Sequence, residues 1–190
     1  MMNIKYGFLL AIAMVLLVVS CDNNPQVPKP RGYFRIEFPE HEYKKYEDDC
    51  PFIFEIPIYS FIVKEKGDNC WMDIYFPANR ATIYLTYKSV NNDLAIHLDD
   101  SREFVYKHTV KADAIEEIRF ENDSLKVYGM FYNLKGNTAT SIQFFLTDST
   151  NHFLRGSMYF DVAPNKDSLA PVVDFLREDI VHLMETFQWK

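Results

Sequence analysis

Apolar residues alternate with polar ones over much of the chain after residue 32, and this two-residue period is typical of half-buried β-strands. In residues 33–38 the apolar Phe34, Ile36 and Phe38 alternate with charged residues until Pro39 stops the pattern. The charged stretch 41–49 that follows is predicted to be a surface turn. Further strands are predicted over residues 52–56, 60–64, 71–76 and 82–87. The last two of these form a hairpin around a turn at residues 77–80.

Two segments have a helical period instead. The first begins at Asn91-Asn92-Asp93, which can cap a helix, and runs to about Lys111. The second starts near Ser168 and continues to the end of the chain. One apolar stripe follows this second helix, at spacings of three and four residues: Val173, Leu176, Ile180, Met184 and Phe187. Such a stripe requires a sheet to pack against.

Four more strands are predicted between the two helices, over residues 114–121, 125–134, 138–147 and 152–162. Their connections are short and rich in turn-forming residues, so an antiparallel meander is the simplest arrangement. The predicted fold is therefore α+β: an antiparallel sheet of about six to eight strands with a mid-chain helix and a C-terminal helix packed on it. The order of elements is also that of the Mog1/PsbP-like fold, by pattern only.

The first twenty residues have the pattern of a leader. Twelve apolar residues, 8–19, follow a short segment whose one charged residue is Lys5. This run is too short to span a bilayer but has the length of a signal-peptide core. Ser20 and Cys21 follow it, as in a lipobox, so we expect cleavage before Cys21 and lipid attachment, including palmitate-type acyl chains, to its thiol. The alternatives are an ordinary secretory signal and an uncleaved anchor.

Residues 21–32 are expected to be a flexible lipidated tether, and residues 33–190 a single globular domain. Cations and aromatics gather where the tether meets the domain, at Lys29, Arg31, Tyr33, Phe34 and Arg35. The simplest interpretation is a stiff tether whose aromatic rings dock on the sheet. The functional alternative is a segment that binds a partner protein or faces anionic headgroups.

Charge and cysteine content narrow the range of functions. The chain has 20 basic and 27 acidic residues, and this acidic balance argues against general nucleic-acid binding. Apart from Cys21, the cysteines are Cys50 and Cys70, each beside a predicted strand. In an exported protein a disulfide between them is expected, and two buried thiols are the alternative. A metal site is not expected, because neither cysteine has a second Cys or His at ligand spacing.

No catalytic motif is visible, and the protein is expected not to be an enzyme or to hold a cofactor beyond its covalent lipid. The chain lacks a glycine-rich phosphate loop, a Gly-x-Ser-x-Gly elbow and a His-Glu-x-x-His motif. Two pairs of residues are candidates for metal ligands or acid–base partners: His97 with Asp99, and Glu178 with His182. Both are predicted to be solvated residues on helix faces.

The chain resembles the gliding motility-associated lipoprotein GldD family of the Bacteroidetes over essentially its whole mature length. The resemblance rests on the lipobox and tether and on these segments: residues 28–36, 49–52, 71–73, 81–87, 136–144 and 153–156. It implies a non-enzymatic role in gliding and in the associated type IX secretion apparatus, with other envelope proteins as partners. It also implies Cys21 as the anchor and Cys50 with Cys70 as the bridge. The expected location is the cell envelope, facing the periplasm, on the outer or the inner membrane.

Exported proteins of that phylum often carry O-linked glycans at Asp-Ser or Asp-Thr when an apolar residue or threonine follows. Three such sequences place candidate glycans on Ser124, Ser149 and Ser168. So short a motif also arises by chance. Two other functions stay open beside the accessory role: an envelope module for small-ligand binding or chaperone-like work, and a hydrolase on an unusual scaffold.

Overall fold

The computed structural model describes residues 35–190, apart from 65, 68 and 69. The small sheet consists of β1 (Tyr43–Glu47), β2 (Phe52–Pro57) and β10 (Gln188–Trp189). The large sheet consists of β3 (Phe61–Lys64), β4 (Met72–Phe76), β5 (Ala81–Ser89), β6 (Ala112–Asn122), β7 (Val127–Gly136), β8 (Thr140–Thr147) and β9 (His152–Phe160). The helices are α2 (Leu94–Tyr106) and α3 (Lys166–Thr186). The predicted α+β class is confirmed.

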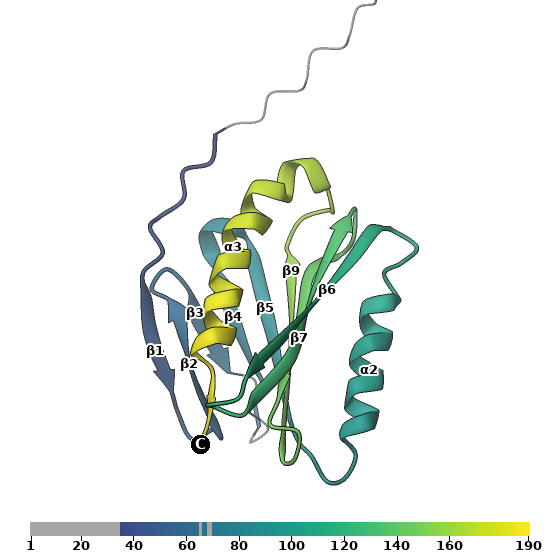
Figure 1. The fold of residues 1–190 in the computed structure, drawn as a ribbon. Coiled ribbons are helices and arrows are strands. Elements are labelled where there is room, and N and C mark those ends of the chain that lie inside the picture. The colour runs from purple at the N-terminus through teal and green to yellow at the C-terminus, as the bar shows by residue number, and fades with distance from the viewer. Residues whose placement is uncertain (1–34, 65, 68–69) are drawn as a thin grey trace, which may run out of the picture. The chain divides into compact units, whose positions relative to one another are not determined.

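The large sheet is antiparallel throughout, in the order β3-β4-β5-β9-β8-β7-β6. Consecutive strands from β6 to β9 pair with one another, which confirms the predicted meander (Figure 1). The predicted hairpin of β4 and β5 also forms, around a short 3-10 turn at Pro77–Asn79. Because β5 pairs with β9, the two halves of the sheet are joined along its centre.

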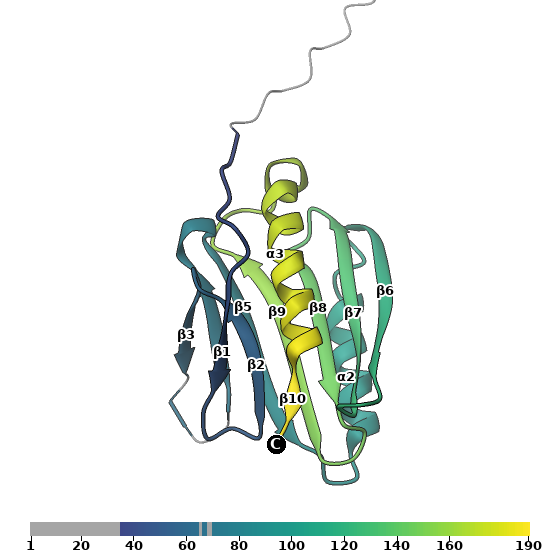
Figure 2. The ribbon, with the colours of Figure 1, turned by 60° about the vertical axis from the view of Figure 1, so that its left-hand side comes forward.

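The two helices cover opposite faces of the large sheet. In both ribbon views α3 lies on the side of the small sheet, whereas α2 lies on the other side (Figure 1, Figure 2). The main core fills the space between the large sheet, α3 and β2, and Phe52, Phe144 and Leu176 are among its fully buried side chains. The apolar stripe predicted for the C-terminal helix is buried here: Val173, Leu176, Ile180, Met184 and Phe187.

The helix α2 packs on the other face of the large sheet through a smaller apolar cluster, which consists of Val105, Tyr132 and Leu134. Its buried residues are His97, Ser101 and Val105, so two of the three are polar. This helix therefore contributes much less apolar surface to the fold than α3, whose eight buried residues include seven apolar ones. The difference leaves polar atoms beneath α2.

The prediction for the first strand is wrong. Residues 35–42 have no regular secondary structure, and the first strand is β1, inside the charged stretch predicted to be a turn. Phe38 stacks on Phe175 of α3, with ring centroids 4.4 Å apart, instead of entering a sheet. Strand β1 tolerates its lysines because it is an edge strand that pairs only with β2.

The ends of the helices also differ from the predictions. The helix α2 ends at Tyr106, five residues before the predicted position, and residues 107–111 form turns. Asp93 occupies the N-cap position, but its carboxylate accepts from the backbone N–H of Asn91 rather than from a helix N–H. After α3 the chain adds β10 to β2, a two-residue strand too short to show a period. Within the described residues, neither helix is long and apolar enough to cross a bilayer.

Candidate functional site

A disulfide joins Cys50 to Cys70, with their Cα atoms 5.7 Å apart. It links the segment before the small-sheet strand β2 to the segment before β4 of the large sheet. Cys50 is buried, and its backbone N–H donates to the Asp48 carboxylate at 2.9 Å. The predicted bridge is therefore present, and it fastens the two sheets to each other at one end.

One carboxylate is buried in the apolar stripe of α3. Asp179 is only 2% exposed, and the Tyr59 hydroxyl donates to its two oxygens at 2.8 and 2.7 Å. The Tyr43 hydroxyl donates at 3.1 Å, and Nδ1 of His41 lies 2.8 Å from the same carboxylate. Burial raises the pKa of Asp179, although the hydrogen bonds from Tyr59 and His41 act in the opposite direction. Three side chains, those of His41, Tyr43 and Tyr59, thus converge on this carboxylate.

Aromatic rings extend this cluster toward the start of the domain. The His41 ring stacks on Phe175 with centroids 4.5 Å apart, and its Nε2 lies 3.1 Å from Glu178. Tyr43 stacks on His182, whose own Nε2 lies 2.7 Å from Glu55 of β2. These contacts clamp the segment that enters the domain to α3.

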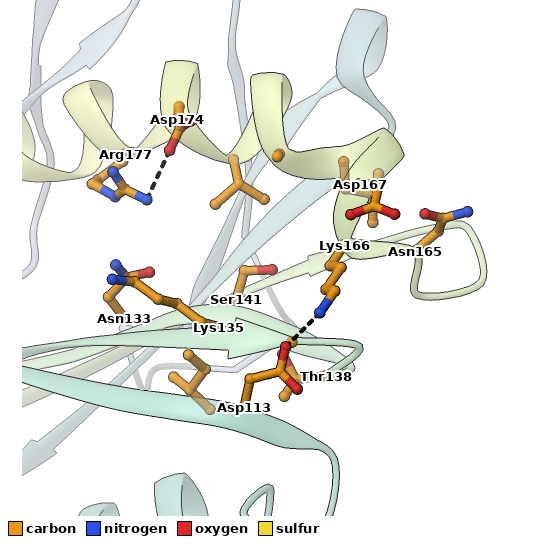
Figure 3. Close-up of a pocket in the computed structure, with 15 residues that line it drawn as sticks. Asp113, Asn133, Lys135, Thr138, Ser141, Asn165, Lys166, Asp167, Asp174 and Arg177 are labelled. Carbon is orange, nitrogen blue, oxygen red and sulfur yellow. Dashed lines mark hydrogen bonds and ion pairs between the residues drawn. The ribbon is translucent and has the colours of Figure 1, made fainter. Parts of the chain in front are cut away.

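A cleft of about 310 Å³ lies beside the first half of α3 (Figure 3). Figure 3 shows charged side chains around it in pairs: Lys166 Nζ lies 2.6 Å from Asp113, and Arg177 lies 2.8 Å from Asp174. Lys135 also lines the cleft, and it lies 3.5 Å from Glu116. The charges of this cleft therefore largely neutralise one another.

The polar groups of this cleft serve the local fold. Asn165 caps α3 by accepting from the backbone N–H of Ser168, and the Thr138 hydroxyl donates to the Thr140 carbonyl at 2.7 Å. No histidine or cysteine lies among its described lining residues. Across residues 35–190 as described, no group of three or more His, Cys, Asp or Glu is placed to hold a metal ion.

The remaining predicted site residues are scattered. Cys21, Lys29, Arg31, Tyr33 and Phe34 lie outside the described residues. Arg35 is described and is exposed. The candidate glycosylation residues Ser124, Ser149 and Ser168 are all exposed, the first two in turns and the third in the first turn of α3. Their use for glycans stays a prediction.

The interpretation of the histidine pairs as solvated helix-face residues holds for Asp99 and Glu178, which are exposed, but it is wrong for the histidines, since His97 is buried and His182 is half-buried. His97 is only 8% exposed, beneath α2, and its ring packs near Phe153. His182 pairs with Glu55, whereas Glu178 pairs with His41. Sequence reasoning missed Asp179 as well. Its signal was available, because residue 179 follows Leu176 by three positions and so falls inside the apolar stripe.

Comparison with known families identifies the chain. The family described as gliding motility lipoprotein GldD matches residues 23–189, which is nearly all of the sequence after the leader. The matched range includes both cysteines of the disulfide and both helices. A comparison with curated proteins gives no match. The chain belongs to the gliding motility lipoprotein GldD family.

Proposed function

We propose that this protein is a non-enzymatic accessory subunit of the gliding machinery and its associated type IX secretion apparatus, tethered to a membrane of the cell envelope by lipid on Cys21. The observation that carries the proposal is the family match over residues 23–189. The leader pattern that ends at Cys21 supports the anchor, and the Cys50–Cys70 disulfide agrees with export to an oxidising compartment.

The cleft of Figure 3 supports a role without catalysis. Its cations and carboxylates are engaged with each other, as Lys166 with Asp113 and Arg177 with Asp174. A catalytic acid or base needs instead a free proton-transfer partner at the site where a substrate binds. The buried carboxylate of Asp179 is likewise surrounded by side chains of the domain itself.

An accessory subunit acts by contact with other proteins, and the large sheet has a surface suited to this. Strand β3 is its edge, and Phe61 and Val63 on that strand are 57% and 53% exposed. Strand pairing places them on the same face as Tyr84 of β5, which is 42% exposed. We call Phe61, Val63 and Tyr84 the edge patch. Exposed apolar surface beside a free strand edge is typical of protein contact sites.

The test replaces the chromosomal gene with a variant carrying Phe61→Asp and Val63→Asp. Because both side chains are more than half exposed, the fold is expected to survive. We expect slower gliding and less type IX secretion at an unchanged amount of lipidated protein. The matched control is Val110→Asp, since Val110 is 92% exposed but lies in the turn after α2. Normal motility and secretion in the double variant would exclude the edge patch as a docking surface.

The anchor has its own test, which is independent of the edge patch. A Cys21→Ala variant should lose the acyl mass and be released from membranes, and intact-mass analysis of the native protein should show a chain that starts at residue 21. A native protein that begins at Met1 with an unmodified Cys21 would refute the tethered location.

A further inference from the structure

A cavity of about 250 Å³ lies between α2 and the large sheet. It is separate from the cleft of Figure 3, which lies beside α3 on the opposite face. Trp71, Phe104 and Phe153 contribute apolar walls, and Lys88 and Arg155 contribute cations. We call this cavity the α2 pocket. An engineered apolar cavity of about 150 Å³ holds benzene, so the α2 pocket has room for an aromatic ring with a short polar substituent.

Several buried polar atoms in and around the α2 pocket make no hydrogen bond. His97 is only 8% exposed, and neither of its ring nitrogens makes a hydrogen bond. The Ser101 hydroxyl, on the next turn of α2, is 3% exposed and has no partner either. The carboxylate nearest to His97 is that of Asp93, at 3.5 Å from Nε2. Buried polar atoms without partners are costly, and few are found in folded proteins.

Arg155 adds a partly buried positive charge to these polar atoms. Its guanidinium lies 4.7 Å from the centre of the Phe104 ring and donates to the Gln143 side-chain oxygen at 2.5 Å. Among the described residues, no carboxylate forms an ion pair with it. The Gln143 amide nitrogen is buried and unpartnered as well. Burial lowers the pKa of Arg155, in agreement with a cation that lacks a counter-charge.

The local charge is opposite to that of the whole chain. The lining of the α2 pocket has two cations, Lys88 and Arg155, against one carboxylate, Asp100, in a protein of formal net charge -7. The arrangement combines an aromatic wall with a charged donor and with two buried side chains, His97 and Ser101, that make no hydrogen bond and can each donate one. A carboxylate joined to an aromatic or apolar group satisfies all three.

We infer that the α2 pocket binds a carboxylate attached to an aromatic group, with the carboxylate on Arg155 and Lys88 and the ring between Phe104 and Phe153. The same chemistry occurs in a free aromatic acid and in the C-terminus of a polypeptide that ends in an aromatic residue. This binding is additional to the accessory role proposed above, and neither depends on the other.

Isothermal titration calorimetry on the mature lipidated protein in detergent tests this inference, with detergent alone as the blank. Three probes are used: phenylacetate as a free acid, acetyl-glycyl-phenylalanine as a chain terminus, and phenylacetamide as the neutral match to the first. At least one of the two acids should bind with a Kd of about 1 mM or lower. The amide should bind at least about tenfold more weakly, because it cannot use the charge of Arg155. The acid that binds more tightly identifies the source of the carboxylate.

Matched variants localise the binding. Arg155→Gln and Lys88→Gln should each weaken acid binding by about tenfold. Lys88 is exposed, so its replacement tests the site even if the Arg155 variant fails to fold. Arg102→Gln removes the same charge from α2 outside the pocket, where Arg102 lies over Tyr106, and it should leave binding unchanged. Absence of binding by either acid at about 10 mM, equal binding of acid and amide, or equal effects of Lys88→Gln and Arg102→Gln would each overturn the inference.

Discussion

The sharpest packing constraint in the large sheet lies at Gly156. This residue of β9 pairs with Phe144 of β8, and the Phe144 ring lies directly over it. A Cβ atom added at Gly156 would lie 2.2 and 2.3 Å from two carbons of that ring. Phe144 is only 1% exposed, so its ring has core side chains around it and no solvent into which it can move. Gly156→Ala therefore forces the core to repack.

The expected loss follows from two opposing effects. Overpacking of a well-filled core costs about 1–3 kcal/mol. Replacement of glycine by alanine restricts the unfolded chain and returns about 0.4–1 kcal/mol. The net expectation for Gly156→Ala is a loss of about 1.5 kcal/mol in the free energy of unfolding. For a domain of this size that is a decrease in Tm of roughly 3–6 °C.

Urea denaturation of the purified mature protein measures this loss, and a double-mutant cycle assigns its cause. Phe144→Leu removes the ring from above Gly156, so in that background Gly156→Ala should be neutral or stabilising. The coupling between the two substitutions should therefore exceed about 1 kcal/mol. An equal cost of Gly156→Ala in both backgrounds would refute the argument, because it would mean that the ring is not the obstacle.

Two further predictions concern covalent and polar contacts. Reduction of the Cys50–Cys70 disulfide, which closes a sequence separation of 20 residues, should lower the free energy of unfolding by about 3 kcal/mol. Urea denaturation with and without reductant measures this loss, and a Cys50→Ala, Cys70→Ala variant should not respond to reductant at all. Asp179→Ala should cost about 1–3 kcal/mol because it leaves buried hydroxyls without an acceptor, whereas Asp179→Asn retains one. Burial raises the pKa of Asp179 above its ordinary value of 3.8, so the carboxyl group holds its proton more tightly in the folded state. The stability of wild type relative to Asp179→Asn should therefore be greatest below about pH 3.8. It should decrease as the pH rises through the folded-state pKa. A stability difference that stays constant from about pH 3 to about pH 8 would contradict this reasoning.

The sequence pattern was sufficient to predict the strands where apolar and polar residues alternate and the turns are short. Strands β6 to β9 and the hairpin of β4 and β5 match their predicted ranges to within a few residues. The stripe on α3 was likewise correct, because one face of that helix is almost wholly apolar. The local spacing of apolar residues is enough to predict these elements, because each strand pairs with a strand close to it in sequence and the helix has a single apolar face.

The pattern failed where a distant contact decides the structure. Residues 33–38 alternate like a strand, yet Phe38 packs on Phe175 of α3, more than a hundred residues away. Strand β1 looks like a charged turn because its lysines face solvent at a sheet edge. The polar cluster around Asp179 joins residues 41, 43, 59 and 179, and no local spacing indicates that these residues meet. Such tertiary pairings are absent from single-sequence periodicity.

Of the six buried side-chain polar atoms without a hydrogen-bond partner in the described residues, four lie on the α2 face, in His97, Ser101 and Gln143, and two lie on the α3 side, in Arg177 and Trp189. On the face covered by α3, the buried carboxylate of Asp179 has three side-chain partners, and its contacts clamp the segment that enters the domain. On the face of α2, the ring nitrogens of His97 and the hydroxyl of Ser101 are buried without hydrogen bonds, although Nε2 of His97 lies 3.5 Å from the Asp93 carboxylate. The edge patch lies on that same face, because Tyr84 alternates with Thr86, a lining residue of the α2 pocket. Since unmet polar atoms and exposed apolar side chains both favour a bound molecule, recognition is expected on the α2 face.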